Sequence, residues 1–219
     1  MAGPVILLGA DPSAETPAAV AALLDEQLAG RSVLVLPVPA AYTHPQRTAD
    51  RVAAWLGARG IAHDIALVLN RRDAADADVA ARAAAAGAFL LTDGTAMHAR
   101  SVLKETLLWE AMCVAHGAGA PIVAAGGGAI VLADPMADER GGGLTLGLGL
   151  LSRMAVVAGH GSWPGHTVKR MRELAGPDVP VASVGRDAAL VLDARVWRAI
   201  GPVEVHVGGR PADVSALPG

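Results

Sequence analysis

The chain has 219 residues, 53% of them hydrophobic, and a formal net charge of −3 with an isoelectric point near 6.1. This length suits one large α/β domain over residues 1–219, and the only basic cluster, residues 169–172, is too small for a phosphate-binding surface, so we expect no nucleic-acid partner. No apolar run reaches the ~18–20 residues that a membrane span needs. Residues 1–9 lack the basic start of a signal peptide and resemble a first buried strand, so we expect a cytoplasmic protein with no membrane partner.

Short apolar runs alternate with segments of helical periodicity along the chain. This alternation predicts parallel βαβ units with helices on both faces of a sheet. The expected strands are residues 4–9, 32–37, 64–69, 87–92, 121–125, 154–158, 181–184, 188–192 and 203–207, and the expected helices are residues 16–28, 48–59, 76–86, 99–116 and 167–174. Residues 133–140 are expected to form a polar loop.

The sequence is organised around residues 121–132, a buried apolar run that three glycines interrupt. The pattern predicts a strand that turns sharply into a helix, where the backbone closely approaches another group. Such turns present the nucleophile of α/β hydrolases in the pattern Gly-x-Ser-x-Gly, but Gly126 stands at the serine position. The glycines could relieve the strain of the turn, and their exposed N–H groups could bind an anion. Both interpretations stay open.

The sequence predicts neither a metal nor another cofactor. The histidines are scattered without His-x-x-x-His spacing, and the glycines at residues 117–119 precede their strand instead of following it, as a dinucleotide fingerprint would. The single cysteine, Cys113, excludes an internal disulfide, and its helical spacing with apolar residues favours a small buried side chain over a reactive thiol.

Five segments together resemble the cyanophycinase and dipeptidase E family of serine peptidases. Residues 89–96 are similar to the family's Phe-Thr-Gly-Gly-Asn/Asp-Gln loop, and residues 124–129 to its nucleophile turn, Gly-Thr-Ser-Ala-Gly-Ala. The family's Gly-Leu-Gly-Leu-Leu occurs unchanged at residues 147–151. Residues 158–161 and 185–191 are similar to its Asp-x-His-Phe and Asp-Glu-x-Thr-Ala-Leu-Val segments. The resemblance covers nearly the whole chain and implies a flavodoxin-like three-layer αβα sandwich with a mostly parallel central sheet, related to class I glutamine amidotransferases.

The departures from the family pattern coincide with its catalytic residues. The nucleophilic serine corresponds to Gly126, and the carboxylate that orients the catalytic histidine in cyanophycinases corresponds to Arg186. The loop that helps to build the substrate site reads Asp93, Gly94 and Thr95. The family's catalytic histidine corresponds to His160 in this sequence.

Dipeptidase E takes its third catalytic residue from a loop just after the nucleophile turn, and Asp134 or Asp138 could fill that place. Asp138 is therefore a catalytic candidate together with His160, which could act as a general base or bind a carboxylate. Ser162 is an alternative hydroxyl near the histidine. Asp93 and Arg186 each place a charge where the family has another residue, and if they face each other the site would suit a zwitterion.

Gly126, Gly127, Asp93, Gly94, Thr95 and Arg186 are the candidate ligand-binding residues. The leading hypothesis is a peptidase-fold protein without serine-hydrolase chemistry that keeps the crevice for a small amino-acid-like or peptide-like ligand. The alternative is an enzyme with reassigned chemistry, in which His160 acts with Asp134, Asp138 or Glu139. A third hypothesis is a structural subunit that contacts another chain, such as a homodimer partner, through residues 141–151. The preference for Arg over Lys and the many alanines favour a bacterial source.

Overall fold

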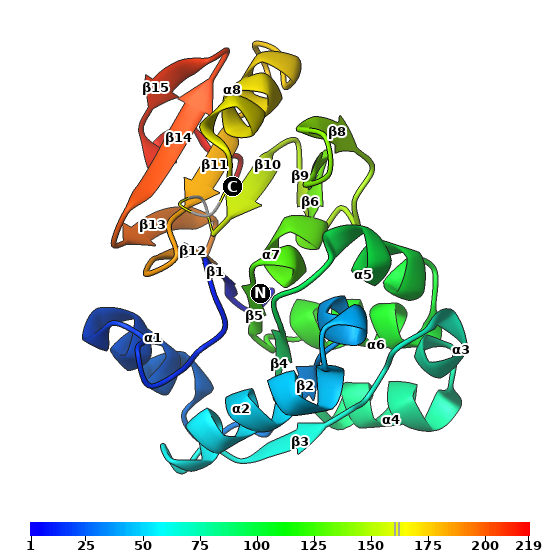
Figure 1. The fold of residues 1–219 in the computed structure, drawn as a ribbon. Helices are drawn as coiled ribbons and strands as arrows, with labels where there is room; N and C mark the ends of the chain where they lie inside the picture. Colours follow the sequence, from blue (N-terminus) through cyan, green and yellow to red (C-terminus); the bar gives the residue numbers. More distant parts are fainter. Residues whose placement is uncertain (160, 162) are drawn as a thin grey trace.

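The computed structural model describes residues 1–159, 161 and 163–219, and its main feature is a seven-stranded, mostly parallel sheet (Figure 1). In spatial order the strands are β13 (Val196–Ile200), β12 (Ala189–Asp193), β1 (Val5–Leu8), β5 (Ile122–Ala125), β4 (Ala88–Leu91), β2 (Val33–Leu36) and β3 (His63–Ile65). The last five are mutually parallel, whereas β12 and β13 are antiparallel additions at one edge. The carboxyl ends of β1, β5 and β4 therefore meet at one rim of the sheet.

Helices cover both faces of this sheet. Neighbouring side chains on each strand point to opposite faces, so Ile6 and Leu8 belong to one core cluster and Val5 and Leu7 to the other. The first cluster lies under α1 (Ala18–Leu28) and α2 (Pro45–Gly57). The second lies under α3 (Arg71–Ala74), α4 (Ala77–Ala85), α5 (Ala96–Leu103), α6 (Leu107–Gly117) and α7 (Gly127–Leu132). Strands covered on both sides must be apolar at every position, which explains their uninterrupted apolar sequences. The predicted three-layer sandwich is confirmed.

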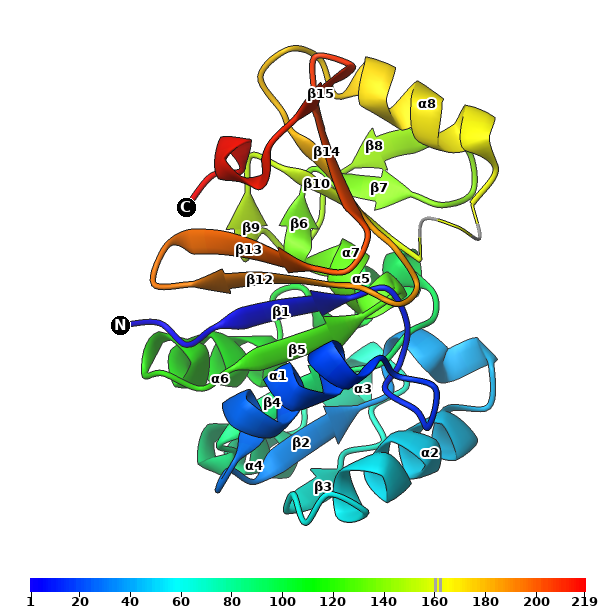
Figure 2. The ribbon, with the colours of Figure 1, turned by 90° about the vertical axis from the view of Figure 1, so that its left-hand side faces the viewer.

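A smaller sheet lies beyond β12 and β13 and carries α8 (Gly165–Leu174), as Figure 2 shows. Its strands are β10 (Ala155–Ala158), β11 (Val181–Val184), β14 (Val203–Val207) and β15 (Arg210–Ala212). Arg172 fixes α8 across two of these strands, because its Nη2 donates to Ser183 Oγ at 3.1 Å and to Glu204 Oε2 at 2.8 Å. The larger core cluster contains residues of both sheets.

Short elements complete the chain. Strand β6 (Ala133–Asp134) pairs with β9 (Leu151–Ser152), β7 (Met136–Asp138) pairs with β8 (Gly143–Thr145), and single 3-10 turns are η1 (Pro39–Tyr42) and η3 (Val214–Ala216). The expected loop at residues 133–140 thus contains two strands, because the following glycine-leucine stretch supplies their pairing partners. The single helix expected over residues 99–116 is two helices, since Glu105 between them has a left-handed φ of 56°. The strand expected at residues 64–69 ends at Ile65, and β13 was not expected.

Candidate functional site

Gly126 forms the predicted sharp turn between β5 and α7. Its backbone has φ 48° and ψ −120°, a conformation that residues with a side chain rarely adopt and glycine adopts without steric cost. The strand, turn and helix of the sequence prediction are therefore present, with a bare backbone where a nucleophile would stand.

The carboxylate of Asp93 fills the space beside this bare backbone. Asp93 follows β4, and its Oδ1 accepts hydrogen bonds from the backbone N–H of Gly94 at 2.7 Å and of Gly127 at 2.8 Å. A Cβ placed on Gly126 would overlap Oδ1 and Cγ of this carboxylate. Of the two interpretations left open for the glycine turn, anion binding is thus met by a carboxylate of the chain itself, and the backbone of Gly126 also adopts a conformation that favours glycine.

The other two glycines of the turn are also required by close packing. A Cβ on Gly127 would overlap the carbonyl oxygen of Gly94, and one on Gly128 would lie 2.7 Å from the carbonyl oxygen of Thr92. The loop after β4 therefore rests directly on the backbone of the turn after β5. This contact is the physical reason for three consecutive glycines.

Asp11 is a site residue that the sequence analysis missed. It lies just after β1, and its Oδ1 accepts a hydrogen bond from the backbone N–H of Asp93 at 2.7 Å. Burial raises its pKa to about 7 and the charge of Asp93 adds to this, while the Asp93 N–H and Arg51 act in the opposite direction. This carboxyl group therefore keeps its proton to a higher pH than an ordinary Asp does. Its place directly after a buried strand of a parallel sheet is a signal that could have identified it.

A cavity of about 180 Å³ lies beside Asp93. It combines two carboxyl groups, Asp93 and Glu139, with the cationic Arg186 and with apolar walls. Trp163 forms one wall, held by a hydrogen bond of 3.1 Å from its Nε1 to the carbonyl oxygen of Ala158. Burial raises the pKa of Glu139, and the charges of Asp93 and Asp138 act in the same direction, while the backbone of Ala96 and the charge of Arg140 lower it. The remaining lining residues are Gly9, Gly127, Ile130, Ala158 and Gly159.

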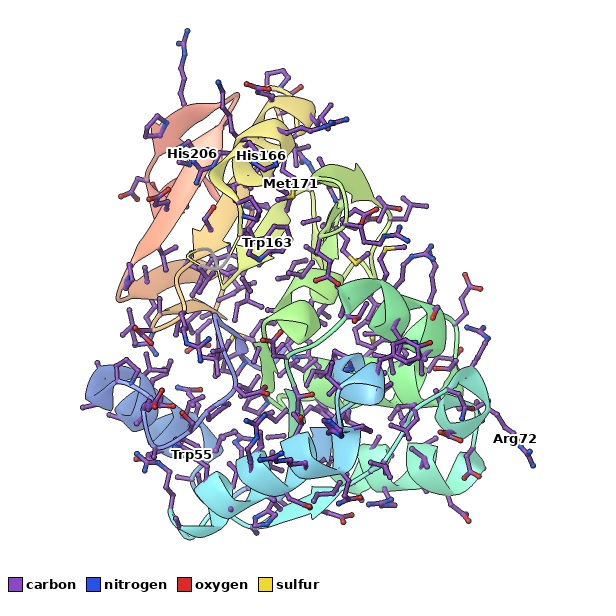
Figure 3. The ribbon with its side chains drawn as sticks, viewed as in Figure 1. Trp55, Arg72, Trp163, His166, Met171 and His206 are labelled. Atoms are coloured by element: carbon purple, nitrogen blue, oxygen red, sulfur yellow. The ribbon has the colours of Figure 1, made fainter. Side chains whose placement is uncertain are left out.

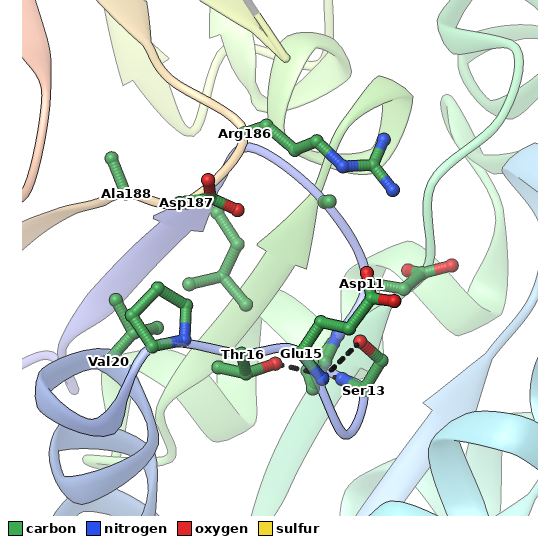
Figure 4. Close-up of a pocket in the computed structure, with 12 residues that line it drawn as sticks. Asp11, Ser13, Glu15, Thr16, Val20, Arg186, Asp187 and Ala188 are labelled. Atoms are coloured by element: carbon green, nitrogen blue, oxygen red, sulfur yellow. Dashed lines mark hydrogen bonds between the residues drawn. The ribbon is translucent and has the colours of Figure 1, made fainter.

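A second cavity, of about 810 Å³, adjoins the first at Asp93 and Arg186, which line both. Its other walls are the loop of residues 10–16 and the side of α2 that carries Arg51 and Trp55. Figure 4 shows Arg186 extending from the segment between β11 and β12 above the loop that carries Asp11. No ion pair joins Asp93 and Arg186 within the part of the chain that the structure describes, so they offer opposite charges to the same space without neutralising each other directly.

The predicted ligand-binding residues divide into two groups. Asp93, Gly127 and Arg186 line the small cavity, and Gly126 lies beneath the Asp93 carboxylate. Gly94 and Thr95 contribute to the walls only indirectly. Gly94 holds the carboxylate through its N–H, and the Thr95 N–H donates to the carbonyl oxygen of Pro39 at 2.8 Å.

Of the two predicted catalytic residues, the structure describes Asp138, which lines neither cavity. His160 and Ser162 lie outside the described residues. Asp138 is on β7 and forms an ion pair with Arg140 at 3.0 Å, and the hydrogen bonds from Arg140 lower its pKa. Asp134 Oδ1 accepts a hydrogen bond of 3.4 Å from the Gly147 N–H. Of the three acids considered as partners of the histidine, Glu139 lines the cavity.

The described residues offer neither a cluster of metal ligands nor a membrane-spanning helix. They contain no group of three or more His, Cys, Asp or Glu side chains arranged to hold a metal ion. No helix among them is both long and apolar enough to cross a membrane.

Comparison with solved structures identifies peptidases of the same fold. The crystal structure of a peptidase from an acI-B1 actinobacterium matches with a TM-score of 0.80 and 20% sequence identity, over 95% of this chain and 91% of that one. A "Putative Peptidase E Protein" from Listeria monocytogenes EGD-e matches with a TM-score of 0.69 and 12% identity, over 91% of this chain and 98% of that one. No family model and no curated protein matches the sequence. These likenesses establish a peptidase-like fold.

Proposed function

We propose that this chain is a peptidase-fold protein without serine-hydrolase chemistry, which binds a small amino-acid-like or peptide-like ligand beside Asp93. The observation that carries the proposal is the relationship between Asp93 and Gly126. Residue 126 has no side chain, and the carboxylate of Asp93 occupies the space in which one would lie.

This relationship removes two requirements of serine hydrolysis together. The reaction needs an oxygen nucleophile on the turn, and Gly126 has none. It also needs N–H groups that are free to stabilise a developing oxyanion. The Gly127 N–H, which directly follows the nucleophile position, already donates to Asp93, and so does that of Gly94. A carboxylate in that place repels the negative charge that the reaction would create.

The small cavity has the chemistry to bind a zwitterion. Arg186 is exposed and has no hydrogen bond or ion pair among the described residues, so it can receive a carboxylate. Asp93 and Glu139 on the same cavity can receive an ammonium group, and Trp163 and Ile130 can contact an apolar side chain. At about 180 Å³ the space is smaller than the roughly 300–1,000 Å³ of typical drug-sized sites, and suits one small amino acid.

A second candidate function is an enzyme with reassigned acid–base chemistry, in which His160 is the general base. The observation that favours it is the pair of raised carboxyl pKa values at the crevice, about 7 for Asp11 and an increase for Glu139. Groups that titrate near the working pH are suited to transferring protons. In this candidate Glu139, and not Asp138, would be the acid that acts with the histidine.

Titration calorimetry with a panel of free L-amino acids and dipeptides tests the proposal, with the recovered ligand analysed by chromatography. We expect at least one ligand to bind and to be recovered intact. Arg186→Gln should weaken that binding roughly tenfold, which corresponds to about 1.4 kcal/mol. The matched control is Arg198→Gln, because Arg198 is exposed on β13 and lines neither cavity.

Two outcomes would overturn the proposal. Absence of binding by every member of the panel would remove its basis. Turnover that disappears in His160→Ala would establish the second candidate instead.

A further inference from the structure

The cavity of about 810 Å³ is far larger than a single amino acid requires. It begins at Asp93 and Arg186, where the small cavity ends, and extends between the loop of residues 10–16 and α2. Figure 3 shows Trp55 and Trp163, which line the large and the small cavity respectively, in well-separated parts of the molecule. A ligand anchored in the small cavity therefore has room to continue past Arg186 towards α2.

Arg51 is a second available cation of the large cavity, besides Arg186. It is exposed on α2 and makes no hydrogen bond or ion pair with any described residue. Its charge lowers the pKa of Asp11, which lines the same cavity. Arg59, on the same cavity, is already engaged, because its Nε is 3.0 Å from Asp25 Oδ1 and its guanidinium carbon is 4.4 Å from the centre of the Trp55 ring.

Three acids also line the large cavity, Asp11, Glu15 and Asp93, and none of them forms an ion pair with Arg51 among the described residues. Oδ1 of Asp11 and Oδ1 of Asp93 each accept backbone hydrogen bonds, and burial raises the pKa of Asp11. The two cavities thus differ in their charges: two acids and one arginine line the small cavity, whereas three acids and three arginines line the large one, and Arg51 stands on α2, away from the shared residues Asp93 and Arg186.

We propose that the two cavities bind one ligand, a short peptide whose amino-terminal residue lies in the small cavity and whose second residue places an acidic group against Arg51. This inference rests on the proposed function and specifies its ligand class. Arg186, at the junction, contacts the part of the peptide between its two residues.

An isosteric pair of dipeptides tests the inference, with affinities measured by titration calorimetry at neutral pH. Alanyl-glutamate and alanyl-glutamine have the same size and differ in one charge. We expect the intact protein to bind alanyl-glutamate roughly tenfold more tightly than alanyl-glutamine. Arg51→Gln should remove this preference, because it should weaken the binding of alanyl-glutamate more than that of alanyl-glutamine. The control is Arg47→Gln, since Arg47 is exposed one turn earlier on α2 and does not line the cavity.

The possible results distinguish a failure of this inference from a failure of the proposed function. Equal affinities for the two dipeptides in the intact protein, or a preference for alanyl-glutamate that survives Arg51→Gln, would overturn the inference and leave the proposed function intact. Binding of free alanine as tight as that of both dipeptides would also overturn it, because the large cavity would then contribute nothing. If alanine, both dipeptides and every other amino acid and dipeptide of the panel fail to bind, the proposed function itself is overturned.

Discussion

The carboxylate of Asp93 lies where a side chain on Gly126 would have to begin. The position of the Asp93 carboxylate and the absence of a side chain at residue 126 depend on each other. The Asp93 carboxylate can accept hydrogen bonds from the N–H groups of Gly94 and Gly127 because residue 126 has no side chain. A side chain on residue 126 would overlap this carboxylate in its present position. The absence of a side chain at residue 126 and the position of the Asp93 carboxylate are therefore coupled.

Introducing a serine at position 126 should destabilise the folded protein unless Asp93 is also replaced. Gly126→Ser would displace a carboxylate that accepts two backbone hydrogen bonds, and it would place a side chain at a positive φ. Losing charge-assisted bonds costs about 1.5–3 kcal/mol, and the backbone strain about 1–2 kcal/mol more. We expect Gly126→Ser to lower the free energy of unfolding by roughly 2.5–5 kcal/mol in urea titrations. Asp93→Gly combined with Gly126→Ser should recover part of that loss relative to Gly126→Ser.

The same variants test whether the turn can still support catalysis. Gly126→Ser should not hydrolyse any member of the dipeptide panel. Hydrolysis can appear only in the variant that combines Asp93→Gly with Gly126→Ser. The control is Asp93→Gly alone. A Gly126→Ser protein as stable as the unmodified one would show that the Asp93 carboxylate moves aside easily, contrary to the geometry described here.

Asp11 should make the protein less stable as the pH rises towards neutrality. Its pKa is about 7 in the folded state against 3.8 for an ordinary Asp, so between these values the folded state holds a proton that the unfolded state has lost. Stability therefore falls from about pH 4 to about pH 7 and is unaffected by this group above that, with a slope no steeper than about 1.4 kcal/mol per pH unit. Asp11→Asn should remove this contribution, because an amide oxygen can still accept the Asp93 N–H.

Urea titrations of the unmodified protein and Asp11→Asn at about pH 5, 6 and 8 measure this effect as a difference. The difference is needed because Glu139 acts in the same direction, whereas His116, whose pKa burial lowers, costs stability as the pH falls. Parallel stability profiles for the two proteins would show that the Asp11 carboxyl is ionised normally.

Cys113 should behave as a packed side chain with low reactivity. It is partly buried on α6 against the larger core cluster, and burial, with a smaller contribution from Glu110, raises its pKa. A raised pKa reduces the thiolate fraction at neutral pH, and the thiolate is the reactive form. Alkylation by iodoacetamide, followed by mass spectrometry, should be slower than that of glutathione under the same conditions, and faster labelling would contradict this assignment. In urea the rate should approach that of an unstructured thiol.

The sequence by itself determined the architecture. Four-residue apolar runs such as Val33–Leu36 and Ile122–Ala125, separated by helical segments, have few arrangements other than a parallel sheet covered on both faces. The triple glycine also predicted a strand-to-helix turn with a close backbone contact, and the absence of a side chain at residue 126 is visible in the sequence alone. These features are local, because they depend on periodicity and on the backbone freedom of single residues.

Only the tertiary structure decided how the site is composed. Asp11 and Asp93, which share a hydrogen bond, are 82 positions apart, and Asp93 and Gly127 are 34 apart. Their contacts follow from the order of β1, β5 and β4 in the sheet, which brings three strand ends to one rim. The sequence identified Asp93 as an unusual charge but could not place it against Gly126, and it gave no reason to connect Arg51 on α2 with the same crevice. The charge and the pKa values of a site depend on which groups are neighbours in space, and a single sequence does not contain that information.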